Sequence, residues 1–125
     1  MSVAATRRQY ARDIGTVGEI VGLRRETADS AIEVGNLRAR VTGFRPEELA
    51  SGVDQGARKV ILLAEDVERA VALGLWPATE GGGPAIVKND RIVVRGAPLN
   101  VEAIDDSTRR LGGVLMAYEI TATGY

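Results

Sequence analysis

The chain lacks cysteine and histidine, and these two absences restrict its chemistry more than any residue that is present. Without cysteine there is no disulfide framework, and without either residue there is no zinc site of the usual nitrogen and sulfur ligands. Histidine is also the most frequent general base in enzymes. We therefore expect no catalytic residue, no metal site and no cofactor, and we expect that the protein is not an enzyme.

The carboxylates do not replace the missing residues in any recognisable pattern. Glu47-Glu48 and Asp105-Asp106 are only adjacent pairs, and no EF-hand spacing surrounds either of them. The first pair suits the start of a helix and the second suits a turn. An enzyme that uses carboxylates alone stays open as an alternative, because acids far apart in the sequence can meet in the fold.

Aromatic residues are also scarce, at 4% of the chain, so the core must consist mainly of Val, Ile, Leu and Ala. No apolar run approaches the roughly 18 residues of a membrane-spanning helix. The first residues lack the apolar segment of a signal peptide. The formal net charge is −1, and the mildly basic start is not the footprint of a nucleic-acid-binding domain. We expect a soluble protein, made in the cytoplasm, with no membrane contact.

The length of 125 residues suits one domain with a modest core. We divide the chain into an N-terminal arm, residues 1–14, and a single β-barrel domain, residues 15–125. The arm is either a short helix or a frayed end, because Ala, Arg and Gln favour helix but no cap stands out. Residues 76–89, WPATEGGGPAIVKN, predict a long flexible loop, since three glycines followed by proline cannot hold regular structure.

Alternating apolar residues predict strands along most of the domain. The apolar parity flips at Gly35-Asn36, which predicts either a one-residue bulge or a hairpin turn there. Residues 65–75 change to helical spacing, with Asp66 as a cap and Gly74 as a stop. Residues 45–58 suit a single short helical turn. The expected strands are 15–25, 30–44, 59–64, the strand–turn–strand unit 89–104, and 114–125.

The last three strands are joined by short turns and predict an antiparallel meander. Strands dominate and helices are minor. We therefore expect a mainly β fold: a small antiparallel β-barrel or rolled sheet of about six strands, with one short helix and a long flexible loop.

Three segments of the chain follow one another in an order that is similar to the order found in a known family of proteins. They are VTGFRPEELASGVDQGARKVILLAEDVERA (41–70), NDRIVVRGAPLNVEAID (89–105) and RRLGGVLMAYEITATG (109–124). Together they resemble the small head–tail joining proteins of tailed phages and related particles such as gene transfer agents, also called head-closure or stopper proteins. The resemblance covers roughly residues 15–124, and its most telling part is the strand–turn–strand unit from Asp90 to Ile104.

The resemblance implies a structural protein of the particle's neck. Such proteins form a ring, usually a hexamer, between the portal or adaptor proteins and the tail terminator or tail tube proteins. They help to retain the packaged DNA that passes through the channel, and they have no enzymatic activity or cofactor. Their long loops reach the channel or the neighbouring ring, and here the candidates are 76–89 and the connection 43–57. We expect the assembly contacts to lie among Arg7, Arg8, Tyr10, Arg12, Phe44, Arg45, Trp76, Pro77, Ile86 and Val87.

Alternative functions stay open beside the joining role. The chain could be a tail terminator or another tail-neck component, whereas an adaptor should be mainly helical. A monomeric partner-binding β-barrel domain is a further alternative, although scattered aromatics offer little of the aromatic-lined groove that would favour it. A ring or a concentration-dependent oligomer in solution supports the joining protein, whereas a strict monomer leaves the binding domain open.

Overall fold

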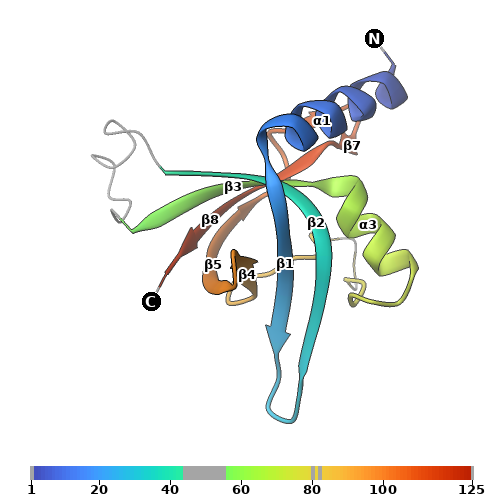
Figure 1. Cartoon of the computed structure of the whole chain (residues 1–125). Coiled ribbons are helices and arrows are strands. Elements are labelled where there is room, and N and C mark those ends of the chain that lie inside the picture. The colour runs from blue at the N-terminus through green and yellow to red at the C-terminus, as the bar shows by residue number, and fades with distance from the viewer. Residues whose placement is uncertain (1, 44–55, 80, 82, 125) are drawn as a thin grey trace.

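The computed structural model describes residues 2–43, 56–79, 81 and 83–124 (Figure 1). In this part of the chain the strands form a closed antiparallel barrel in the order β1-β2-β3-β8-β5-β4, with β4 pairing back to β1. The barrel strands are β1 (Glu19–Glu26), β2 (Ala31–Gly43), β3 (Ala57–Leu63), β4 (Arg91–Val94), β5 (Ala97–Asp105) and β8 (Ala117–Thr123). The expected small, mainly β barrel is confirmed.

The N-terminal arm is a regular helix, α1 (Val3–Val17), that lies across one end of the barrel (Figure 1). Its start is capped by Ser2, whose Oγ accepts a hydrogen bond from the amide of Ala5 at 3.0 Å. Ile14 faces the barrel and is buried. No cap was predicted here, although Ser2 stands directly before the helix and serine is a frequent cap residue.

The helix runs three residues past the expected arm, so the first strand begins at Glu19 and not at position 15. Gly18 separates the two elements. A Cβ at this position would lie 2.3 Å from the carbonyl oxygen of Ala39 and 2.4 Å from that of Ile14. Only glycine lets α1 and β2 approach so closely, and this contact sets where the helix ends.

The change of apolar parity in β2 is a bulge, as one of the two interpretations predicted. Val21 pairs with Leu37 and Leu23 pairs with Val34, so Gly35 and Asn36 together oppose a single residue of β1. Asn36 has a φ of 59°, the left-handed conformation that an extra bulge residue often adopts. The strand continues through the bulge, and the hairpin turn that was the other interpretation does not form here.

The C-terminal strands form the expected meander, because β4, β5 and β8 are adjacent and antiparallel. Arg95 and Gly96 connect β4 to β5 with φ values of 48° and 81°, which is typical of a two-residue type I′ turn. A small ribbon of β6 (Arg110–Leu111) and β7 (Val114–Leu115) interrupts the path from β5 to β8. The sequence predicted a turn where β6 lies and one continuous strand over 114–125, which the structure divides into β7 and β8.

The expected helix after the third strand is α3 (Ala64–Ala72), which packs beside β2 and β8. Gly74 follows its end with a φ of 74°, as a helix stop requires. The expected role of Asp66 as the helix cap is wrong. The cap residue is Leu63, with no side-chain cap bond, while the carboxylate of Asp66 is buried and turned toward β2.

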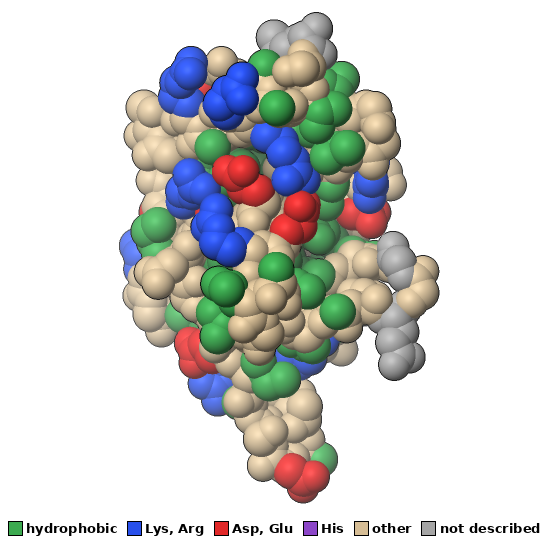
Figure 2. All heavy atoms as spheres, turned by 90° about the vertical axis from the view of Figure 1, so that its right-hand side faces the viewer, with side chains coloured by type: hydrophobic (Ala, Val, Ile, Leu, Met, Phe, Trp, Pro, Cys, Tyr) green, Lys and Arg blue, Asp and Glu red, His purple; other side chains and the backbone are tan. Residues whose placement is uncertain are grey.

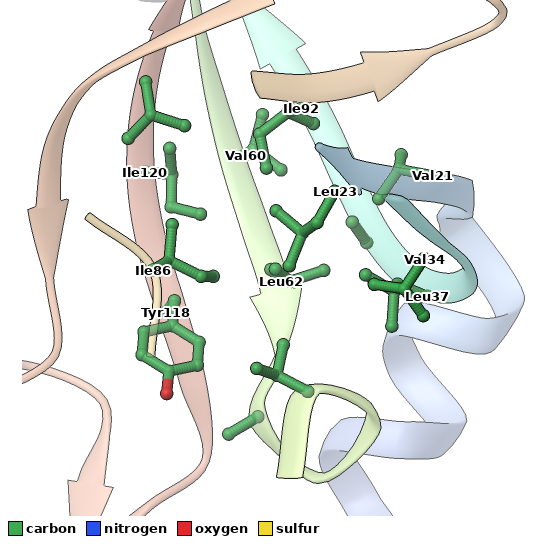
Figure 3. Packing of buried hydrophobic residues seen from close by; sticks show 14 of the residues in the cluster. Val21, Leu23, Val34, Leu37, Val60, Leu62, Ile86, Ile92, Tyr118 and Ile120 are labelled. Carbon is green, nitrogen blue, oxygen red and sulfur yellow. The ribbon is translucent and has the colours of Figure 1, made fainter. Parts of the chain in front are cut away.

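The core fills the barrel with aliphatic side chains, as the low aromatic content predicted (Figure 3). Each barrel strand contributes its inward-facing residues, and Val67 and Ala70 of α3 extend the same cluster. The fully buried members drawn in Figure 3 include Leu23, Val60, Leu62, Ile86, Ile92 and Ile120. The expected helical turn within residues 45–58, and most of the 43–57 connection, lie outside the described residues.

Candidate functional site

The borders of the 76–89 loop are part of the barrel core. Trp76 is 2% exposed and Ile86 is fully buried. The indole Nε1 of Trp76 donates to the carbonyl oxygen of Ala85 at 2.9 Å, which ties the two borders together. Within the loop, the hydroxyl of Thr79 donates to the carbonyl oxygen of Pro84 at 2.7 Å.

A bidentate ion pair fixes the second border of the loop to β1. The guanidinium of Arg25 donates from Nε and Nη2 to the two carboxylate oxygens of Asp90, both at 2.8 Å. Its Nη2 also donates to the carbonyl oxygen of Ala85 at 3.1 Å, and its Cζ lies 4.9 Å from the centre of the Trp76 ring. Asp90 in turn accepts from the amide of Val87 at 2.9 Å. We call Arg25, Trp76, Ala85, Val87 and Asp90 the loop latch.

The loop latch shows that some of the expected partner contacts on this loop are instead contacts within the protein. Trp76 and Ile86 were expected to contact a partner protein, but the structure places both side chains in the core, where they are not accessible to one. Pro77 is half-buried beside them. Val87 is 41% exposed, so it is the apolar border residue that the surface presents.

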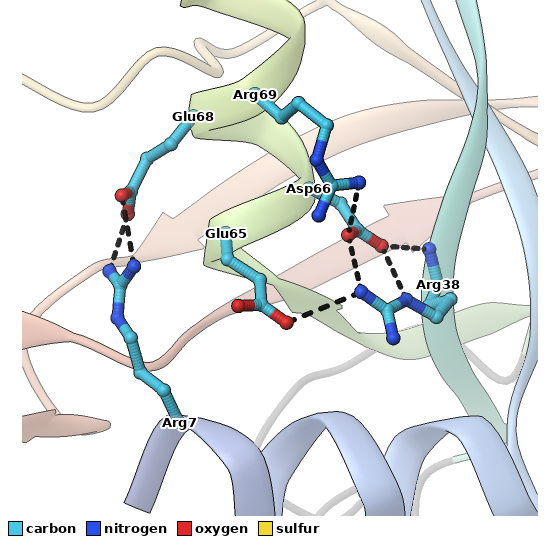
Figure 4. Close-up of polar contacts among 6 residues, drawn as sticks. All are labelled: Arg7, Arg38, Glu65, Asp66, Glu68 and Arg69. Carbon is cyan, nitrogen blue, oxygen red and sulfur yellow. Dashed lines mark hydrogen bonds and ion pairs between the residues drawn. The ribbon is translucent and has the colours of Figure 1, made fainter. Parts of the chain in front are cut away.

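A second ion-pair cluster joins α3 to β2 (Figure 4). Asp66 accepts from the backbone amide of Arg38 at 2.8 Å, and from the Nε and Nη2 of the same residue at 3.0 Å and 2.8 Å. Arg69 and Glu65 complete the group. Burial by itself would raise the pKa of Asp66, but the hydrogen bonds from Arg38 outweigh it and hold that pKa below its usual value.

Arg7 connects α1 to the other side of α3 (Figure 4). Its guanidinium makes two hydrogen bonds to the carboxylate of Glu68, at 3.1 Å and 2.6 Å, and a third to the carbonyl oxygen of Leu115 at 2.8 Å. The hydrogen bond to Glu68 raises the pKa of Arg7. Arg7 was expected to contact a partner, and the structure uses it to hold the helix on the barrel.

A groove of about 330 Å³ runs between α1 and the outer face of β2 and β3. Its apolar lining includes Tyr10 and Ile61, and Val17 at its end is 58% exposed. Arg40 and Arg109 supply positive charge at its sides. The Nη1 of Arg109 lies 3.5 Å from the hydroxyl of Tyr10, which links the helix to the chain before β6.

The predicted contact residues thus fall into separate groups. Arg8 and Arg12 are exposed on α1, and Tyr10 lines the groove. Phe44 and Arg45 lie outside the described residues. Arg7, Trp76 and Ile86 hold the helix and the loop in place, Pro77 is half-buried, and the side chain of Val87 is exposed. The structure therefore brings the arm residues to one end of the molecule and the loop residues to another part of it.

Sequence reasoning missed the most prominent surface feature, which is the far end of the β1–β2 hairpin. In Figure 1 this hairpin extends well beyond the barrel, on the side away from α1. Residues 26–31 are all exposed. A signal was available, because the strand predicted at 30–44 is much longer than those within 89–104 and cannot be covered along its whole length.

The comparisons with known proteins add no identification. No protein-family model matches the chain, and neither a curated protein nor a solved structure is significantly similar to it. Neither described helix has the length and apolar character needed to cross a lipid bilayer. Among the described residues, no three acidic side chains gather into a possible metal-binding group.

Proposed function

We propose that this chain is a structural ring subunit in the neck of a tailed phage or a phage-like particle. In this role it joins the head, through portal or adaptor proteins, to tail terminator or tail tube proteins, and it helps to retain packaged DNA. Its place is in the virion, and it acts without enzymatic activity or a cofactor. The particle and its partners come from the resemblance of the segments around Asp90–Ile104 to head–tail joining proteins.

The observation that carries the proposal is the position of the exposed elements on a compact closed barrel. The helix α1 lies at one end and the β1–β2 hairpin projects from the other (Figure 1). A ring subunit must present two different surfaces, one to each neighbour, because a ring with cyclic symmetry is built from head-to-tail contacts. Elements that project in opposite directions supply such a pair of surfaces.

The buried charges support a structural role over a catalytic one. Among the described residues the buried carboxylates are Asp66 and Asp90, and each is held by an arginine. A general acid or base needs a site that faces a substrate, whereas these two acids tie α3 and the loop to the barrel. The groove beside α1 favours a second candidate, a monomeric barrel that binds a partner segment between Tyr10 and Ile61.

Deleting the gene from the genome that carries it tests the proposed function. We expect electron micrographs to show heads without tails and free tails of normal length, and an intact copy of the gene to restore joined particles. Tails of irregular length would indicate the tail terminator role. Normal joined particles would overturn the neck proposal, and a strictly monomeric protein that captures a partner would then support the binding domain.

A further inference from the structure

The end of the β1–β2 hairpin is free of the rest of the barrel. β1 pairs with β4 only as far as Arg24, and β2 pairs with β3 only from Ala39 onward. Residues 26–31, which we call the hairpin tip, therefore touch no third strand and are exposed throughout. An isolated two-stranded hairpin is only marginally stable in water, so a long projection of this kind needs a further reason.

The hairpin tip is nevertheless closed by hydrogen bonds of its own. The amide of Thr27 donates to the carbonyl oxygen of Ser30 at 2.8 Å, and the amide of Ser30 donates back to the Oγ1 of Thr27 at 3.1 Å. Just behind the tip, Arg24 pairs with Glu26 at 3.2 Å and with Glu33 at 3.5 Å. A projection that is already shaped loses little entropy when it binds, which favours a docking role.

The charge of this end is negative. The three acids Glu26, Asp29 and Glu33 outnumber the two arginines described beside them, Arg24 and Arg91, because Arg25 is committed to Asp90 in the loop latch. Asp29, in the turn itself, forms no ion pair with a described residue. In Figure 2 the projection below the body ends in acidic side chains. The partner surface should therefore be positive.

The matching positive surface is on α1. Arg8 and Arg12 are exposed one helical turn apart, so they share a face of the helix. Neither has a carboxylate partner among the described residues, and the guanidinium of Arg12 donates to the Oε1 of Gln9 at 3.5 Å. The nearest acid along the helix, Asp13, already accepts a hydrogen bond from Gln9 at 2.9 Å. In Figure 2 basic side chains lie in the upper half of the visible face, with acidic side chains among them, and the projection lies at the lower end.

We propose that the hairpin tip of one copy docks on the Arg8 and Arg12 face of α1 in the next copy. Because the two surfaces lie at opposite ends of the molecule, a single chain cannot bring them together. The contact is therefore intermolecular and head-to-tail, as a ring requires. The inference rests on the proposed function, and it names the surface by which that ring forms. Since both surfaces are solvent-exposed charges, added salt weakens the contact.

A charge swap tests this contact directly. The tip variant carries Glu26→Lys and Asp29→Lys, and the helix variant carries Arg8→Glu and Arg12→Glu. Sedimentation at rising protein concentration should show association of the unchanged protein at low salt, and association weakened about tenfold or more in each variant alone. The protein with all four changes should associate again, because the attraction is restored with the signs exchanged. Circular dichroism confirms that each variant is folded.

Matched controls separate this contact from an effect of net charge. Glu102→Lys changes an exposed acid on β5, and Arg58→Glu changes an exposed base on β3; neither should alter association. The inference is overturned if the unchanged protein stays monomeric at every concentration, if the controls weaken association as much as the variants, or if the fourfold change does not restore it.

The outcome is distinguishable from that of the neck proposal. Tailless heads after gene deletion, combined with no restoration in the charge swap, would keep the neck role and reject the docking surface. Restored association, combined with normal particles after gene deletion, would keep the docking surface and reject the neck role.

Discussion

Removing Asp90 should detach the 76–89 loop from the barrel and lower the free energy of unfolding by about 3–4 kcal/mol. The carboxylate of Asp90 is 2% exposed and accepts two bonds from Arg25. Breaking a buried ion pair costs about 3–5 kcal/mol. The side chain of Arg25 is 25% exposed and regains contact with water when Asp90 is removed, so we expect a cost near the lower limit of this range. The amide of Val87 also loses its acceptor, which adds about 1 kcal/mol.

The opposite change, Arg25→Met, should cost more than Asp90→Ala, at about 4–5 kcal/mol, because it leaves a buried carboxylate without a countercharge. It also removes the guanidinium from the Trp76 ring. The double change Arg25→Met with Asp90→Ala removes both charges together. We expect its cost to fall below the sum of the single changes by about 1–3 kcal/mol.

Urea titration followed by tryptophan fluorescence measures this cycle. Trp76 is the only tryptophan of the chain and is a member of the loop latch, so its emission should shift to the red when the latch opens. Amide exchange at Val87 gives an independent signal. Single changes that each cost less than about half a kcal/mol would refute the reasoning, as would a double change equal to the sum of the two.

Other positions give further expectations. Ile92→Ala and Val101→Ala, at fully buried positions of the meander, should each lower the unfolding free energy by about 2–4 kcal/mol in urea titration, and losses below half a kcal/mol would remove these strands from the core. Gly18→Ala should cost about 2–3 kcal/mol, since its Cβ meets backbone; an unchanged urea midpoint would contradict the close approach. Because the pKa of Asp66 is lowered in the folded state, its stabilisation is complete above the usual aspartate pKa and is lost as the pH falls through the lowered one. Asp66→Asn should flatten the acid slope of stability, and an identical slope would show that Asp66 does not carry it.

The sequence predicts the barrel because its strongest signals are local. Period-2 alternation marked the strands of the meander, and the change of parity between Val34 and Leu37 located the bulge without any knowledge of the partner strand. Gly74 follows the end of its helix as expected, because the ease with which glycine adopts the left-handed conformation depends on the residue itself and not on a distant partner.

The remaining features depend on partners that are distant in the sequence. Asp66 looks like a helix cap until Arg38 of β2 is placed beside it, and no local pattern brings the two together. Trp76 stands next to a glycine-rich stretch that indicates an exposed loop, whereas its burial depends on Arg25 and Ala85. The candidate contacts on the loop were misplaced for this reason. The hairpin tip was missed because its turn residues do not indicate a projection, which only the length of the predicted strand 30–44 does.

The strand order of the barrel also decides when the barrel can close during synthesis. β8 is the last of the barrel strands along the sequence and lies between β3 and β5, so it is the strand that closes the cylinder. Until residues 117–123 are available, β1 to β5 can form only an open sheet whose two outer edges, on β3 and β5, offer unpaired backbone groups to other chains. A nascent chain that stalls before β8 is therefore an aggregation hazard, and one short strand converts it into a molecule whose barrel has no edge to share.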